Sequence, residues 1–150
     1  MKPSRWWWIG PIVLLYVLWR WLPRGDIPAL GATAGRLSSC PDSPNAVSSQ
    51  ATDSRHAIAP LAITGNPATA LQRCRDAVLG EPGLRLVEEG TNYLRFEAVT
   101  RWWRFVDDLE CLADPTNGVI HVRSASRIGR SDLGTNRRRI ERIRDRLAGK

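Results

Sequence analysis

"YLRFEAVTRWWRFVDDLECL", residues 93–112, is the stretch from which the fold can be inferred. Its first half is predicted to be a strand, because apolar residues alternate with polar ones at Leu94, Phe96 and Ala98. Its second half predicts a further strand, with one apolar face made of Trp103, Phe105, Leu109 and Cys111. The same alternation turns Asp107 toward that apolar face, and Asp108 and Glu110 toward the opposite one.

Patterns before this stretch predict two more strands and a helix. Residues 57–63 are typical of a short strand, and Leu84 and Leu86 mark another, ahead of turn residues 89–92. A helix is predicted from Asn66-Pro67 to about Leu79, because proline suits the first helical turn and a glycine follows the end.

Patterns after the stretch complete the domain. Residues 114–118, DPTNG, are a strong turn signal, and residues 119–126 are predicted to be the last strand. A final helix follows Ser131-Asp132. The order strand, helix, four strands, helix implies an α+β fold, with an antiparallel sheet of four to five strands packed by two helices.

A strongly apolar run occupies residues 6–22 at the amino terminus. As a helix it would span about 25 Å, close to the ~30 Å hydrocarbon core of a bilayer. Both ends carry the tryptophans expected of interfacial belts, namely Trp6, Trp8, Trp19 and Trp21. We therefore expect a transmembrane anchor at residues 1–24, a linker and irregular lead-in at 25–55, and the α+β domain at 56–148.

The flanking charges predict how this anchor is oriented. The amino terminus, Lys2 and Arg5 precede the span, whereas Arg20 and Arg24 follow it with Asp26 nearby, so the balance slightly favours a cytoplasmic amino terminus. This predicts a single-pass protein of the inner (cytoplasmic) membrane whose domain lies on the periplasmic or extracytoplasmic side.

The chain is basic, with a net charge of +7 and a pI of about 10.3. Such a balance suits anionic lipid, acidic cell-wall material or nucleic acid, although a solvated basic surface gives the same composition. The three cysteines lack C-x-x-C spacing, which argues against zinc, and we expect no cofactor. No motif of known DNA-docking geometry occurs, so nucleic acid is the least favoured partner.

Two groups of residues are weak catalytic candidates. Cys40 and His56, with Asp42 or Asp53, have the residue types of a nucleophile, a base and an orienting acid. The alternative is a structural loop held by Asx turns. Asp107 is the other candidate, and the alternative for it is a structural ion pair with a buried arginine such as Arg123 or Arg127.

The stretch around Gly129 predicts an anion-binding site. It lies directly before the last helix, where backbone N–H groups and guanidinium groups suit a phosphate or carboxylate. The candidate residues are Arg127, Arg130, Ser131 and Arg137. The alternative is that Asp132 caps the helix and the arginines form salt bridges within the domain.

Three stretches together resemble a known family: CPDSPNAVSSQ (40–50), YLRFEAVTRWWRFVDDLECL (93–112) and GVIHVRSASRIGRSDLGTNRRRIERIR (118–144). They are similar to the bacterial and plastid family catalogued as domain of unknown function 1499, over about residues 40–147. The resemblance implies no biochemical activity, because the family has none established. The family's first motif commonly has a second cysteine where this sequence has Ala46, so any role of such a pair is absent here.

These observations lead to a functional expectation. We expect an anchored envelope protein whose domain is a non-enzymatic binding or accessory module for an anionic envelope component or a protein partner. One alternative is a hydrolase acting on lipid or cell-wall material. Another is a cytoplasmic-facing domain that binds nucleic acid.

Overall fold

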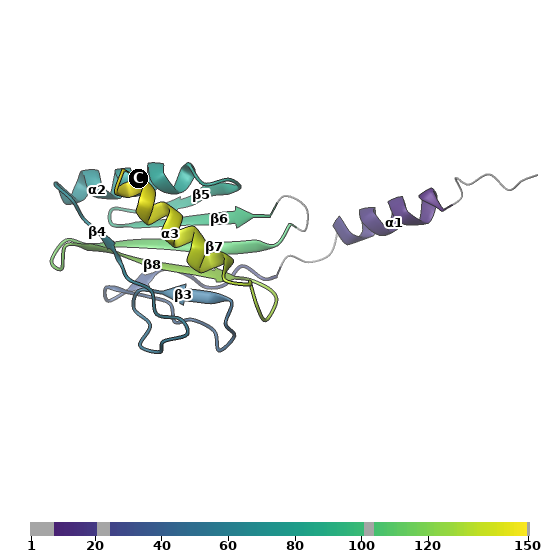
Figure 1. The fold of residues 1–150 in the computed structure, drawn as a ribbon, viewed down its shortest axis with the longest axis horizontal. Helices are drawn as coiled ribbons and strands as arrows, with labels where there is room; N and C mark the ends of the chain where they lie inside the picture. Colours follow the sequence, from purple (N-terminus) through teal and green to yellow (C-terminus); the bar gives the residue numbers. More distant parts are fainter. Residues whose placement is uncertain (1–7, 21–24, 101–103, 150) are drawn as a thin grey trace, which may run out of the picture.

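The computed structural model describes residues 8–20, 25–100 and 104–149 (Figure 1). Its described part contains an antiparallel sheet in the order β3-β8-β7-β6-β5, with β4 also paired to β8. The strands are β3 (Ala46–Ser48), β4 (Leu61–Ala62), β5 (Leu84–Glu89), β6 (Tyr93–Val99), β7 (Val106–Asp114) and β8 (Val119–Ser126). The α+β class is confirmed, but this sheet has six strands rather than four to five.

The difference in strand number arises at the outer edge of β8. Residues 46–48 pair with residues 123–125, and Leu61–Ala62 pair with residues 119–120, so two short strands share one edge. Of the strand predicted at 57–63, only Leu61–Ala62 near its end form a strand in the structure. Strands this short have no alternation of their own, and only their pairing with β8 defines them.

Helices α2 (Pro67–Leu79) and α3 (Thr135–Leu147) cover one face of the sheet (Figure 1). The helical bounds of α2 agree with those predicted from Pro67 and Leu79. Between the helices and the sheet lies a core in which the most deeply buried side chains include Cys74, Val78, Phe96, Leu109, Val122, Ile140 and Ile143. The predicted apolar faces of α2 and of residues 94–98 therefore face this core.

Strand β7 starts later than its apolar pattern predicted. The strand begins at Val106, and Phe105 is 45 % exposed rather than buried. Arg104 has a φ of 53°, outside the extended region, and its N–H donates to the carbonyl of Thr100 in a loop that leads into β7. Trp103 lies outside the described residues.

Residues 25–55 are part of the folded unit rather than a linker. They contain a small hairpin of β1 (Ala32–Thr33) and β2 (Arg36–Leu37), followed by β3. Leu37 and Val47 are buried, and the side-chain amide of Asn45 donates to the carbonyl of Gly129 over 2.6 Å. The domain therefore begins before residue 56. A composition rich in Pro, Gly and Ser predicts loops but does not show whether they pack.

Helix α1 covers Ile9–Arg20, within the predicted anchor. Of the tryptophans assigned to membrane interfaces, Trp8 is exposed and the ring of Trp19 lies 6.2 Å from that of Tyr16, whereas Trp6 and Trp21 lie outside the described residues. Among the residues that the structure describes, none of the helices has both the length and the apolar character needed to cross a bilayer. The transmembrane helix is therefore not confirmed.

Candidate functional site

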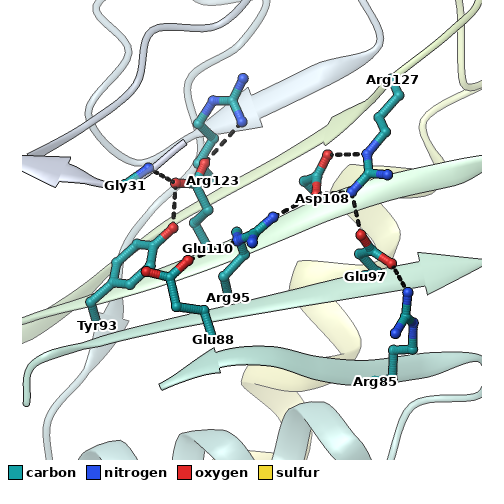
Figure 2. A network of polar contacts seen from close by, with 10 residues as sticks. All are labelled: Gly31, Arg85, Glu88, Tyr93, Arg95, Glu97, Asp108, Glu110, Arg123 and Arg127. Carbon is teal, nitrogen blue, oxygen red and sulfur yellow. Dashed lines mark hydrogen bonds and ion pairs between the residues drawn. The ribbon is translucent and has the colours of Figure 1, made fainter. Parts of the chain in front are cut away.

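The face of the sheet opposite the helices carries the polar face network, shown in Figure 2. Because side chains alternate along a strand, the residues between the apolar positions of β6, β7 and β8 all point to this second face. The strand register sets Glu110 opposite both Arg95 and Arg123, which brings opposite charges together. The network consists of Arg85, Glu88, Tyr93, Arg95, Glu97, Asp108, Glu110, Arg123 and Arg127.

Glu110 is the most buried member of the network, with no exposed surface. Its carboxylate accepts hydrogen bonds from Arg123 (2.9 Å), from the Tyr93 hydroxyl (2.8 Å) and from the backbone N–H of Gly31 (3.1 Å). Burial, together with the charge of Glu110, raises the pKa of the Tyr93 hydroxyl above its ordinary value. These contacts hold the lead-in segment across the polar face.

Arg127 separates two carboxylates that the register places side by side. Glu97 is paired directly with Asp108, an arrangement that repels unless a cation intervenes. The Arg127 guanidinium donates twice to Asp108, at 2.8 Å each, and also to Glu97. The hydrogen bond with Asp108 is the main cause of a raised Arg127 pKa, and burial opposes it. Arg127 is therefore a structural cation rather than a free anion-binding group.

Beside the network lies a cleft of about 840 Å³, lined by residues 36–42, 48 and 50–56 and called the cleft below. The predicted catalytic group of Cys40, Asp42, Asp53 and His56 all line it. A smaller hollow of about 300 Å³ shares Ser39, Cys40 and Pro41 with the cleft and reaches Asp108, Arg123 and Arg127 on the polar face. Residues 39–41 of the lead-in segment thus lie between the cleft and the hollow and line both of them.

His56 is hydrogen bonded at both ring nitrogens. Its Nδ1 lies 2.9 and 3.0 Å from the two carboxylate oxygens of Asp53, and its Nε2 lies 3.1 Å from the carbonyl oxygen of Ser43. Both partners are hydrogen-bond acceptors, so each ring nitrogen faces an oxygen of the protein. The hydrogen bond from His56 outweighs burial and lowers the pKa of the Asp53 carboxyl. Both ring nitrogens are therefore engaged by Asp53 and Ser43 rather than by the Cys40 thiol.

Cys40 has the character of an ordinary thiol. Burial raises its pKa, and the nearby positive charge of Arg123 offsets this only in part. A nucleophilic cysteine requires the thiolate, which a lowered pKa favours. The cleft thus brings the predicted residues together without arranging them for nucleophilic catalysis.

The predicted anion site before α3 is not formed. Asp132 accepts the N–H groups of Gly134 (2.9 Å) and Asn136 (2.7 Å), so its carboxylate occupies the helix end. Ser131 accepts the N–H of Leu133, and Arg137 donates to the carbonyls of residues 55 and 57. Of the four candidates only Arg130 is exposed without a partner within the described residues. The alternative of capping and internal pairing therefore holds.

Asp107 forms an ion pair, but with a different arginine from those predicted. Its carboxylate accepts a 2.7 Å hydrogen bond from Arg139 of α3, and both side chains are buried. One of the predicted partners, Arg123, lies on the opposite face of the sheet, where it pairs with Glu110. The alternation that turns Asp107 toward the helices also separates it from Asp108. No group of three or more metal-ligating side chains occurs within the described ranges.

One constellation was not selected from the sequence. The Ser49 hydroxyl lies 3.2 Å from Nδ1 of His121, and Nε2 of His121 lies 3.5 Å from a carboxylate oxygen of Asp114. The Ser49 oxygen also accepts the N–H of Val122. Ser49 is far from His121 in the chain, and Asp114 belongs to the turn signal at residues 114–118. The signal available in the sequence was a histidine on the polar side of a predicted strand.

Comparison with known proteins gives one match. The family model described as Protein of unknown function (DUF1499) matches residues 36–147. No curated protein and no solved structure matches the chain significantly. The match covers the sheet, both packed helices and all but the first part of the lead-in segment.

Glu97 should make the stability of the domain depend on pH. Burial raises its pKa, but the hydrogen bonds and charges of Arg127 and Arg85 outweigh burial and hold it below the ordinary value of 4.5. A carboxyl whose pKa is lower in the folded state than in the unfolded state stabilises the fold at pH values above its ordinary pKa. This contribution is lost as the pH falls through the folded-state pKa. We expect Glu97→Gln to reduce the free energy of unfolding by about 1–3 kcal/mol at pH 7, and the difference from wild type to shrink toward pH 3.

The measurement is urea unfolding of wild type and variant between pH 7 and pH 3. Glu141→Gln is the matched control, because Glu141 forms an exposed pair with Arg144 on α3. Its unfolding curve should follow that of wild type at each pH. Equal pH dependence in wild type and Glu97→Gln would contradict the assignment.

Proposed function

We propose that this chain, which belongs to the family described as Protein of unknown function (DUF1499), is a membrane-anchored, non-enzymatic module that binds an anionic envelope component in the cleft. The observation that carries the proposal is the cleft itself. It is large and polar, burial raises the pKa of its thiol, and its histidine is hydrogen bonded to Asp53 and Ser43 rather than to that thiol.

The lining of the cleft supports an oxygen-rich anionic ligand. Arg36 and Arg55 are exposed on it, and among the described residues only one hydrogen bond, from Arg55 to the carbonyl of Asp42, engages either guanidinium. Asp53 is engaged by His56, which leaves Asp42 as the other carboxylate on the lining beside the two arginines. Guanidinium groups recognise phosphate and carboxylate through paired hydrogen bonds. The cleft also offers hydroxyls without partners in the described structure, at Ser38, Ser39, Thr52 and Ser54.

Most other arginines near the surface are engaged and support no separate anion site. On α3, Arg142 and Arg146 pair with buried Glu81, and Arg144 donates to the carbonyls of residues 59 and 60. A nucleic-acid surface needs guanidinium groups that are available to phosphates. The basic last helix therefore argues less for nucleic acid than its composition suggested.

Membrane anchoring is supported by the amino-terminal segment. Helix α1 has apolar side chains on all sides, and those of Ile12, Leu14 and Leu15 are each more than half exposed. A helix that is apolar all round is normally covered by other apolar groups. A bilayer supplies that cover for the longer apolar run at residues 6–22. The excess of positive charge before the run supports placing the domain outside the cytoplasm.

A hydrolase remains the second candidate, on a different site from the one the sequence indicated. The hydrogen-bonded order Ser49, His121, Asp114 is that of a nucleophile, a base and an orienting acid. In such a site His121 would take the Ser49 proton as the serine oxygen attacks an ester carbonyl. Neither Ser49 nor His121 lines the cleft or the adjoining hollow, so this candidate ranks second.

The cleft proposal predicts that two arginines carry ligand binding. We expect Arg36→Ala combined with Arg55→Ala to weaken binding of a soluble polyphosphate or polyuronate by about tenfold or more, since a charged hydrogen bond is worth roughly 1.5–3 kcal/mol. Binding is measured by calorimetry on the full chain in a neutral detergent. Arg130→Ala combined with Arg138→Ala removes the same charge from α3 and its preceding loop, and should change the affinity less than about twofold.

Two results would contradict this. Equal losses in both double variants would show attraction to net charge alone. Full-strength binding by the cleft variant would show that the ligand binds outside the cleft. If neither anion binds wild type, a protein partner becomes the occupant to test.

Anchoring and orientation predict the outcome of a topology experiment. A reporter active only outside the cytoplasm, fused after Lys150, should give signal in intact bacteria, and a reporter active only inside should not. A matched fusion without residues 1–24 should lose the outside signal. The reverse pattern would place the domain in the cytoplasm and raise the nucleic-acid hypothesis to first place among the alternatives.

The hydrolase candidate is separated from the binding proposal by chemical labelling. A fluorophosphonate probe reacts with activated serines, so the binding proposal predicts that it leaves the purified chain unlabelled. Labelling that Ser49→Ala abolishes and Ser54→Ala retains would establish Ser49 as a nucleophile. That result would make the hydrolase reading the correct one.

A further inference from the structure

Two cysteines from distant parts of the chain meet in the core. Cys74 lies on α2 and Cys111 on β7, and their sulfur atoms are 3.7 Å apart. Both are free in the structure and almost completely buried, at 0 and 1 % exposure. We propose that Cys74 and Cys111 are a disulfide-forming pair that cross-links helix α2 to the sheet when the domain folds under oxidising conditions.

The packing of α2 explains why these two residues meet. Cys74 belongs to the apolar stripe of the helix, between Leu71 and Val78, and Cys111 belongs to the helix-facing side of β7. A disulfide requires the sulfurs to approach to about 2.05 Å. Since the sulfurs are already in contact, closing the remaining gap requires rotation about the Cα–Cβ bonds together with small shifts of α2.

The third cysteine, Cys40, lies where it does not compete with Cys74 and Cys111 for disulfide formation. Cys40 is partly exposed and lines the cleft and the hollow, the latter together with Arg123 on the polar face. Cys74 and Cys111 lie between the sheet and the helices. The sheet therefore separates Cys40 from both members of the pair, and Cys40 serves as an internal control.

The reaction is an ordinary thiol–disulfide exchange. The thiolate of one cysteine attacks a disulfide oxidant, such as oxidised glutathione or a protein disulfide, and releases one thiol of that oxidant. The thiolate of the second cysteine then attacks the mixed disulfide, which forms the Cys74–Cys111 bond and releases the second thiol. The pair loses two electrons and two protons, and the oxidant is reduced to two thiols.

Burial decides when the bond forms. In the folded reduced state the contact with Cys74, followed by burial, raises the pKa of the Cys111 thiol and disfavours the thiolate. Neither sulfur is open to an oxidant in that state. The exchange therefore takes place before α2 packs on β7, and afterwards the same packing shields the bond from reductants. A folded reduced chain should oxidise far more slowly than one that is refolding.

The test refolds the purified full chain from urea, in one arm with a glutathione redox mixture and in the other with excess reductant. Free thiols are then counted after denaturation with a maleimide reagent that adds mass. Of the three cysteines, wild type refolded with glutathione should retain one reactive thiol and wild type refolded in reductant all three. Cys40→Ser should retain none in the oxidising arm, and Cys74→Ser should retain both of its cysteines.

Stability gives a second readout. The cross-link should raise the melting temperature of the oxidised over the reduced protein by on the order of 10 °C. Cys74→Ser should show no dependence on the redox buffer, and Cys40→Ser should behave as wild type. The proposal is overturned if Cys40→Ser keeps two reactive thiols after oxidative refolding, or if the disulfide found includes Cys40.

The state of the pair in cells tests the location separately. The proposed extracytoplasmic domain would carry the oxidised pair when extracted under thiol-blocking conditions. A chain that is reduced in cells but forms the Cys74–Cys111 bond on refolding would contradict the location and leave the pairing intact. A chain that never forms the bond in the refolding arm would contradict the pairing, whichever compartment holds the protein.

Discussion

The buried carboxylate of Glu110 is the constraint around which the polar face is built. A charge without solvent contact is tolerated only where partners replace water, and three donors do so here: Arg123, the Tyr93 hydroxyl and the backbone of Gly31. Gly31 belongs to the lead-in segment, and Arg123 also donates to the carbonyl of Ser39 in the same segment. The ion pair therefore holds the lead-in on the sheet, and the lead-in in turn forms one wall of the cleft.

Arginines of the last helix hold the segment at the end of the cleft and just beyond it. Arg137 and Arg144 donate to backbone carbonyls of residues 55–60, a segment with little regular structure of its own. A guanidinium can satisfy two carbonyls at once in a fixed geometry, which an ammonium does less well. Many of the arginines that make the chain basic therefore form hydrogen bonds within the fold. The positive charge left at the cleft, on Arg36 and Arg55, is more informative about ligands than the net charge of the chain.

Local patterns predicted the regular elements closely. Helix 67–79 and strand 119–126 follow from a first-turn proline, turn residues and side-chain periodicity, all of which act within a few residues. The same patterns grouped Cys40 with His56, and both line one cleft. They could not show that hydrogen bonds to Asp53 and to a carbonyl occupy His56. Nor could they select Ser49 and His121, because that contact depends on how a loop lies against β8.

By itself, the sequence determined the α+β class, the apolar faces of α2 and of residues 94–98, and the side of the sheet on which Asp107 lies. These properties depend on periodicity, which the backbone geometry of a helix or strand imposes locally. Only the tertiary structure decided that Asp107 pairs with Arg139, that Glu110 takes Arg123 and that Cys74 meets Cys111. Such partners are chosen by strand register and by the packing of helices on the sheet. Strand register and helix packing are set when the whole core is buried together, so no short stretch of sequence specifies these pairs.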